Sequence, residues 1–179
     1  MALNTEQALL LKKGIIQIYG EVDEAMAGYI RECLPILAIN DNPSINIWFT
    51  SQGGSVIHGL DIYDMLHSYP GQTTGLVINH AQSMAVIILQ ACAKRLANPN
   101  SQLLVHDPIL MGLSVKTLRN QGKLQKALDK DSRRIYDRIY RILSRRSGNS
   151  MTTIRKLCNK AEDMFADEAL AIGLIDEIV

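Results

Sequence analysis

Short apolar runs rich in β-branched residues alternate with amphipathic segments of helix length along most of the chain. The strand-like runs are Gly14–Gly20, Ile45–Phe49, Thr73–Ile78 and Gln102–Val105. Helices are predicted between them: one after Asp23, one from Ser55 to about Ser68, and one over Ser83–Lys94. This alternation indicates βαβ units and a mainly parallel sheet, whose strands are covered on both faces. The predicted fold class is therefore α/β.

The pattern changes after Pro108. A long helix is predicted over about 115–146, with Gly122 weakening its first part. Its apolar stripe consists of Leu128, Ile135, Ile139 and Ile142. Two shorter helices, near Thr152–Lys160 and Asp167–Ile172, and a last strand, Ile175–Val179, are predicted to follow. Because no linker, repeat or low-complexity segment interrupts residues 1–179, we expect a single domain.

Composition excludes several classes of protein. Hydrophobic residues make up 47% and the formal net charge is +1, so neither bulk disorder nor a nucleic-acid coat is expected. The longest apolar stretch, Met84–Ala93, is too short to span a membrane. The first residues lack a signal or transit pattern, which predicts a cytoplasmic protein. Three cysteines without metal-ligand spacing predict reduced thiols, no metal site and no cofactor.

Positive charge is concentrated in one segment. Residues 114–146 hold eleven Lys or Arg and three Asp, a net of +8, which leaves −7 for the rest of the chain. The basic residues are Lys116, Arg119, Lys123, Lys126, Lys130, Arg133, Arg134, Arg138, Arg141, Arg145 and Arg146. We therefore expect a basic helix beside an acidic body.

Two strand-to-helix turns have the form that acyl transfer by a serine requires. In Thr50–Ser55, the pair Gly53-Gly54 lets backbone N–H groups approach a ligand closely. In His80–Met84, Ser83 precedes an apolar helix whose N-terminus favours developing negative charge. From spacing alone, two simpler interpretations are each as plausible as the catalytic one: an ordinary tight turn at the glycines and an N-cap at Ser83.

Several motifs, in order along almost the whole chain, resemble ClpP, the proteolytic subunit of the Clp protease. They are Leu10–Asp23, Gly53–Met65, Ala81–Met84, Pro99–Pro108 and Asp163–Ile178. The resemblance implies the ClpP/crotonase-like fold of repeated β-β-α units. It also implies a head, about 1–108 and 150–179, and a protruding long-helix handle, about 109–149.

The resemblance implies a role for each matching residue. Ser83 is the nucleophile, His106 the general base and Asp163 the acid that orients it. The oxyanion hole is formed by the backbone N–H groups of Gly54 and Met84. The substrate-binding positions are Gly53, Val56 and Asp107.

Assembly is also implied by the resemblance. Family members form heptameric rings, two of which stack into a tetradecamer around a chamber, and AAA+ ATPases feed unfolded polypeptide into it. The short segment before the first strand leaves little length for axial loops, so a partner ClpP ring is a second candidate partner. No nucleic acid or membrane partner is expected.

The chain departs from the family pattern around the site. The usual Ala-Ala-Ser-Met-Gly reads Ala81-Gln82-Ser83-Met84-Ala85, and the usual His-Gln-Pro reads His106-Asp107-Pro108. Asp107 either raises the pKa of His106 or points away from it. A shortened loop between Phe165 and Glu168 leaves Glu162 and Asp167 as alternatives to Asp163.

Other polar residues have simpler roles. We predict surface or interface positions for His58 and His67 and a polar position without base function for His80. Ser55 is expected to be an N-cap and Cys92 a core residue. Lys94 is excluded as a partner of Ser83, because it is expected three turns further along one helix, roughly 16 Å away.

Three functions are compatible with these features. The first is an ATP-dependent serine endopeptidase that acts inside a ring chamber. The second is a structural accessory subunit that docks onto partner rings without turnover of its own. The third is an acyl-CoA enzyme of the related crotonase fold, which does not need Ser83 and His106. A short, divergent member of this kind resembles phage-borne or plastid subunits, so plastid stroma and infected host cytoplasm are alternative locations.

Overall fold

The computed structural model describes residues 3–107 and 121–179, the latter with side chains from residue 134 on. Its helices are α1 (Thr5–Lys12), α2 (Glu24–Ile39), α3 (Val56–His67), α4 (Met84–Leu89), α6 (Gln121–Ser147), α7 (Met151–Lys160) and α8 (Ala166–Ala171). Its strands are β1 (Ile15–Val22), β2 (Ile45–Gly54), β3 (Thr73–Gln82), β4 (Lys94–Ala97), β5 (Gln102–Leu104), β6 (Asp163–Phe165) and β7 (Glu177–Ile178).

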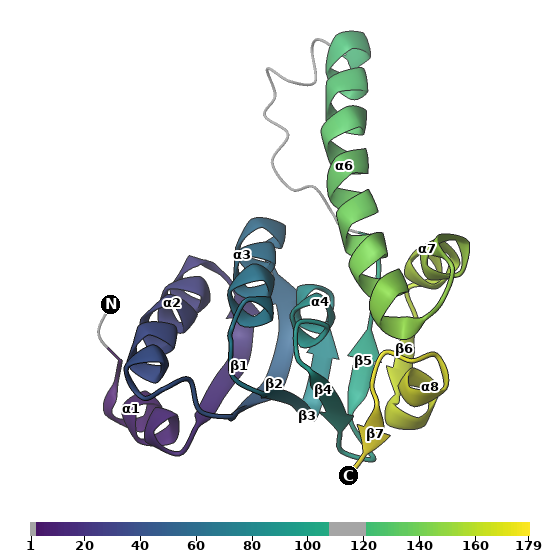
Figure 1. Cartoon of the computed structure of the whole chain (residues 1–179). Coiled ribbons are helices and arrows are strands. Elements are labelled where there is room, and N and C mark those ends of the chain that lie inside the picture. Colours follow the sequence, from purple (N-terminus) through teal and green to yellow (C-terminus); the bar gives the residue numbers. More distant parts are fainter. Residues whose placement is uncertain (1–2, 108–120) are drawn as a thin grey trace.

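The strands form one mainly parallel sheet, in the order β1-β2-β3-β4-β7. Strand β3 changes partner along its length: Thr74–Val77 pair with β4, whereas His80–Gln82 pair with β5. Strand β6 completes this end of the sheet as the antiparallel neighbour of β5. Helices α3 and α4 pack beside each other and beside the sheet (Figure 1). The α/β fold class predicted from the alternating pattern is confirmed.

The core lies between the sheet and the helices that cover it. Strand residues such as Ile16, Ile47 and Phe49 are completely buried, as are Ile88 and Leu89 of α4. Every residue of α4 is buried, which explains why its sequence is apolar all round instead of on one stripe. This buried helix fixes the position of the turn that precedes it.

Helix α6 rises away from the body and forms the protruding handle (Figure 1). Near its C-terminal end, Ile139 and Leu143 are buried and Ile135 and Ile142 are half-buried against the core. The predicted stripe is therefore confirmed for Ile135, Ile139 and Ile142. The side chain of Leu128 lies outside the described residues, as do the predicted start of the helix and the segment 109–114.

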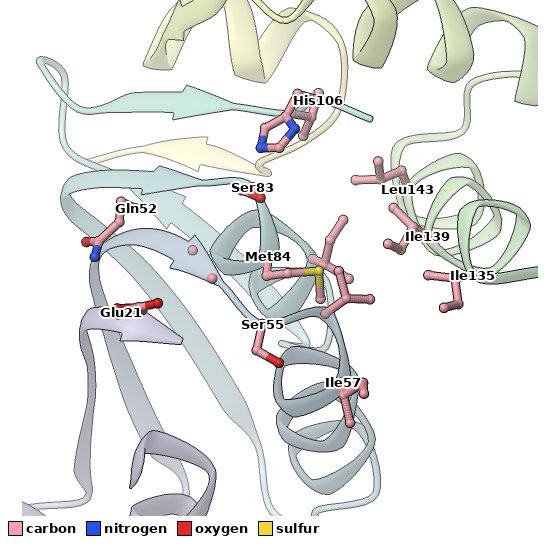
Figure 2. A pocket seen from close by; sticks show the side chains of 15 residues that line it. Glu21, Gln52, Ser55, Ile57, Ser83, Met84, His106, Ile135, Ile139 and Leu143 are labelled. Carbon is pink, nitrogen blue, oxygen red and sulfur yellow. The ribbon is translucent and has the colours of Figure 1, made fainter. Parts of the chain in front are cut away.

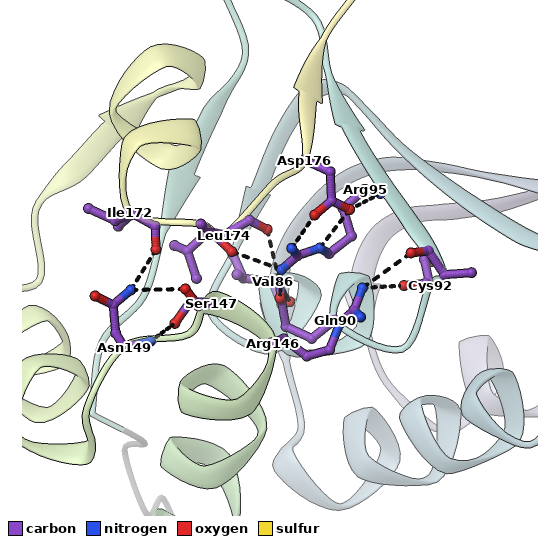
Figure 3. Close-up of polar contacts among 12 residues, drawn as sticks. Val86, Gln90, Cys92, Arg95, Arg146, Ser147, Asn149, Ile172, Leu174 and Asp176 are labelled. Carbon is purple, nitrogen blue, oxygen red and sulfur yellow. Dashed lines mark hydrogen bonds and ion pairs between the residues drawn. The ribbon is translucent and has the colours of Figure 1, made fainter.

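A polar network holds the base of α6 to the body (Figure 3). Arg95 is only 4% exposed, and its guanidinium binds both carboxylate oxygens of Asp176 and the Gln90 side chain. Arg146 of α6 donates to the carbonyl of Cys92 at 2.7 Å, and Asn149 donates to the carbonyl of Ile172 at 2.7 Å. These bonds tie three segments that are far apart in the sequence.

Three elements were not predicted. Helix α1 begins with a capping box between Asn4 and Gln7, and β6 lies between the two short helices predicted near Thr152–Lys160 and Asp167–Ile172, where no strand is predicted. The helix expected over Ser83–Lys94 ends at Leu89, and Lys94, its last expected residue, is the first residue of strand β4. Lys94 therefore does not lie on one helix with Ser83, so the prediction of a shared helix was wrong.

Lys94 is nevertheless far from Ser83. It pairs with Thr74 near the start of β3, nine residues before Ser83, or roughly 30 Å along a strand. Its ammonium group binds Glu177 of β7 at 2.6 Å. Among the described residues, no helix is both long and apolar enough to cross a membrane.

Candidate active site

Ser83 occupies a strained turn between β3 and α4. Its backbone has φ 53° and ψ −122°, a conformation that residues with a Cβ rarely adopt. Its amide N–H donates to the carbonyl of Leu104 in β5 at 2.7 Å, which holds the turn against the neighbouring strand. Its side chain makes no capping hydrogen bond, so the N-cap alternative does not describe this serine. A serine on a strained strand-to-helix turn is typical of a nucleophile elbow.

The glycine turn after β2 lies directly against this elbow. Gly53 has φ 85°, and a Cβ on it would lie 2.7 Å from the Cβ of Ser83 and 2.8 Å from the backbone N of Met84. Gly54 has φ 151°, and a Cβ on it would lie 2.5 Å from the carbonyl oxygen of Val22. Only glycine fits at these positions, so both strand-to-helix turns can meet at one place.

The side chain of Ser51 holds the glycine turn through two hydrogen bonds. It is completely buried, and its hydroxyl donates to the carbonyl of Gly20 at 2.5 Å while accepting from the N–H of Gly53 at 3.1 Å. The first N–H groups of α4, beginning with Met84, have no carbonyl within their own helix. The two turns thus place the backbone around Gly53 and the N–H of Met84 beside Ser83.

His106 follows β5 and faces the same cleft as Ser83 (Figure 2). The cleft has a volume of about 800 Å³. Of the predicted site residues, it brings together Gly53, Gly54, Val56, Ser83, Met84 and His106. One wall is formed by α6 through Ile135, Ile139 and Leu143. Ser83 and His106 therefore share a cleft that has one apolar wall.

The predicted acid Asp163 does not line this cleft. In the sheet, Asp163 pairs with Leu104, which pairs in turn with Gln82, so the three residues form one row across β6, β5 and β3. The amide of Gln82 donates to the carboxylate of Asp163 at 3.2 Å. Of the alternatives, Glu162 forms an ion pair with Lys160, and Asp167 is exposed in the first turn of α8.

The carboxylate of Asp107 points away from the cleft. It accepts a hydrogen bond of 2.6 Å from the hydroxyl of Tyr140 in α6. It lines a second cavity, of about 410 Å³, together with Arg155 of α7. The backbone carbonyl of Asp107 lies 2.7 Å from Nδ1 of His106.

The remaining candidates lie outside the cleft or shape its edge. Ser55 is confirmed as the N-cap of α3, where its hydroxyl accepts from the N–H of His58. His58 pairs with Glu24 at 2.8 Å, and His67 stacks on Tyr63. Cys92 is confirmed as a core residue, and burial raises the pKa of its thiol to about 12. No cluster that could hold a metal ion occurs in the part of the chain that the structure describes.

Three sets of hydrogen bonds at the site are not predicted from the sequence: the two bonds of the Ser51 hydroxyl, the Gln82–Asp163 bond and the Tyr140–Asp107 bond. Ser51 stands two residues before Gly53, which is a detectable signal for a side chain that caps a turn. The other two bonds join residues 81 and 33 positions apart, and no local sequence pattern indicates them.

A mainly parallel sheet with an elbow serine and a protruding long helix defines a protein of the ClpP/crotonase-like fold. Within that class, the chain matches the Clp protease family over residues 2–179 and belongs to it. It is therefore a ClpP-like protease, a hydrolase that acts in proteolysis. Proteins of this family generally form ring oligomers.

Proposed function

We propose that the chain is a serine endopeptidase subunit, with Ser83 as nucleophile and His106 as general base. The observation that carries this proposal is the strained elbow at Ser83, whose uncapped side chain shares one cleft with His106. Backbone strain of this kind persists where the surrounding structure enforces it, and it is concentrated at functional sites. Family resemblance makes Asp163 the first candidate for the acid that orients His106, but its carboxylate binds Gln82 here.

The proposed chemistry proceeds through an acyl-enzyme. The Oγ of Ser83 bonds to the peptide carbonyl carbon, its proton passes to Nε2 of His106, and the carbonyl π electrons move to oxygen. The backbone N–H groups of Gly54 and Met84 stabilise this oxyanion. The C–N bond then breaks, and the amine leaves with the proton from His106. Water attacks the ester and gives its proton to His106, which returns it to Ser83 as the acid product leaves.

We further propose that substrate binds as an added strand. The segment after Gly54, including Val56, and the segment after His106, including Asp107, are the candidate neighbours of that strand. Main-chain hydrogen bonds give little sequence preference. Restriction to unfolded chains therefore falls to a ring chamber, which we propose to be a tetradecamer of two heptameric rings.

The proposed cellular setting is ATP-dependent proteolysis in the cytoplasm, with an AAA+ Clp ATPase or a partner ClpP ring as partner. We treat residues 1–179 as one peptidase domain of head and handle. The second candidate is an accessory subunit without turnover. One observation favours it: Asp163 is bound to Gln82, and no ion pair with His106 is formed among the described residues.

A fluorophosphonate probe separates the candidates. We expect labelling of the wild type at Ser83, with hydrolysis of a short fluorogenic peptide, and loss of both in Ser83→Ala. Because the hydroxyl contributes chemistry and little packing, native mass spectrometry should find the same oligomer for both proteins. An unlabelled wild type, or a Ser83→Ala variant that still hydrolyses the peptide, would contradict the peptidase assignment.

A further inference from the structure

Nδ1 of His106 has a hydrogen-bond acceptor that is not a carboxylate. It lies 2.7 Å from the backbone carbonyl oxygen of Asp107. A carbonyl oxygen only accepts hydrogen bonds, so this contact requires a proton on Nδ1 and leaves the lone pair of Nε2 free. That tautomer is the one in which Nε2 can take the proton of Ser83.

We propose that the Asp107 carbonyl, held in place by Tyr140, orients His106 in the role that a carboxylate usually fills. The proposal rests on the proposed function, because it concerns how the base of that same site is positioned. Tyr140 acts through Asp107 and is a positioning residue. It connects the base of α6 to the loop that carries His106.

The Tyr140–Asp107 bond is partly buried. The hydroxyl of Tyr140 donates to the Asp107 carboxylate at 2.6 Å, and the side chain of Tyr140 is buried. Burial, and next the hydrogen bond to Asp107, raise the pKa of Tyr140 well above its ordinary value, so the hydroxyl remains a donor. The guanidinium of Arg155 lies 5.5 Å from the ring centre and packs against it. These contacts hold the Asp107 side chain against α6, and the backbone carbonyl of the same residue lies at Nδ1 of His106.

Three carboxylates at or beside the predicted triad positions have other partners. Asp163 accepts from Gln82, Glu162 binds Lys160, and the carboxylate of Asp107 itself accepts from Tyr140. Gln82 stands where the resembled family usually has alanine, so the competing donor for Asp163 is a feature of this chain. Within the described residues, the Asp107 carbonyl is the partner that Nδ1 has.

The first test measures kinetics of Tyr140→Phe, which removes the hydroxyl and keeps the ring. Losing one hydrogen bond of about 1–1.5 kcal/mol from the positioning of the base corresponds to about a tenfold fall in kcat. KM should change by less than about twofold, because no substrate contact is lost. The matched control is Tyr69→Phe, which removes another partly buried hydrogen bond, of 2.7 Å to the carbonyl of Pro43, just before the start of β3 and far along that strand from Ser83.

Tyr69→Phe should lower the melting temperature as much as Tyr140→Phe while keeping wild-type kcat. Equal kcat values for the two variants would overturn the proposal. A loss of kcat in Asp163→Asn that exceeds the loss in Tyr140→Phe would also overturn it, because the carboxylate would then be the orienting group. Removal of a triad carboxylate can lower kcat by about 10⁴.

A second measurement uses the wild type alone and does not depend on activity. The chain has four histidines, so ¹⁵N NMR of protein labelled at histidine can assign the tautomer of His106. We expect a protonated Nδ1 and an unprotonated Nε2; the opposite tautomer excludes the carbonyl as acceptor. A wild type whose Ser83 is not labelled by the fluorophosphonate would refute the proposed function, whereas the tautomer decides this inference separately.

Discussion

A side chain at Gly53 would collide with the turn that carries Ser83. We predict that Gly53→Ala lowers kcat/KM about a hundredfold, because a Cβ 2.7 Å from that of Ser83 must displace the elbow by a fraction of an ångström to an ångström. The measurement is hydrolysis of a fluorogenic peptide together with the rate of fluorophosphonate labelling.

Gly20→Ala is the control for backbone strain. Gly20 has φ 82°, close to the 85° of Gly53, but a Cβ at Gly20 would meet nothing within 4 Å. We expect Gly20→Ala to lower the free energy of unfolding by about 1–2 kcal/mol and to keep near wild-type activity. If both variants lose activity alike, strain in the glycine turn and not the contact with the elbow is the cause.

At this scale, residues on turns were easier to anticipate than their partners. Ser83 and His106 were expected at strand ends on the strength of turns and motifs, and they do share one cleft. The partners of Asp163 and Asp107 depend on strand register and on how α6 packs. A single sequence carries no local record of either, because the bonded residues are tens of positions apart.

Strands β4 and β7 are joined by two ion pairs that differ in burial. Asp176 pairs with the buried Arg95, whereas Lys94 and Glu177 are both about half exposed. We predict that Asp176→Asn lowers the free energy of unfolding by about 3 kcal/mol, because it leaves a buried guanidinium without its counter-ion. Glu177→Gln, the matched control, should lower it by less than about 1 kcal/mol. Urea unfolding at neutral pH measures both.

The contribution of Asp176 to the free energy of unfolding should decrease as the pH falls. Burial acts to raise the pKa of Asp176, but the hydrogen bonds and charge of Arg95 outweigh it, and the pKa is lowered. A carboxylate with a lowered pKa in the folded state stabilises the protein above its unfolded pKa of about 3.9. That contribution is lost as the pH falls through the folded value. The difference between wild type and Asp176→Asn should therefore shrink below about pH 4, and a difference that stays constant down to pH 2 would contradict this reasoning.

The elements that escaped prediction share a physical reason. The run Met84–Ala93 contains no glycine or proline, and a buried helix and the approach to a buried strand are equally apolar, so periodicity does not separate α4 from β4. Strand β6 has three residues and exists because β5 is its neighbour. Helix α1 did have a local signal, the Asn4–Gln7 capping box.

The described part of α6 presents a basic face to solvent. Arg134, Arg138, Arg141 and Arg145 are exposed and spaced by four, three and four residues, so they share one side of the helix. None of the ion pairs found among the described residues includes them. If the proposed double ring forms, this face has an acidic body of the same chain type available to it.

We predict that the contact between rings is sensitive to salt. Raising the ionic strength from 0.15 M to 1 M shortens the Debye length from about 8 Å to about 3 Å. Sedimentation velocity should then show double rings giving way to single rings or smaller species. The double variant Arg134→Glu, Arg138→Glu should do the same at low salt.

The control makes the same change of charge elsewhere, through Lys12→Glu and Arg31→Glu, both exposed and outside α6. It should keep the double ring at low salt. A double ring that withstands both high salt and reversal on α6 would make the arginines a solvated face. A shift of DNA or RNA by the wild type at physiological salt would indicate nucleic acid as the partner instead.

For the whole molecule, the alternating pattern predicted the α/β sheet, and the change after Pro108 predicted the long helix. The order of strands across the sheet was not predicted. It depends on β3 pairing with β2 on one edge and with β4 and then β5 on the other.

The divided pairing of β3 has a consequence for the time course of folding. Strands β1, β2 and the first half of β3 are joined by short crossovers, and their pairing requires only the first part of the chain. The second half of β3, which leads directly into Ser83, pairs with β5, and β5 pairs in turn with β6, some sixty residues further on. Contacts between distant residues form slowly, because more chain entropy is lost in closing the loop between them. We therefore expect a nascent chain to pair β1, β2 and the first half of β3 early, and the turn at Ser83 to become ordered only when synthesis is nearly complete.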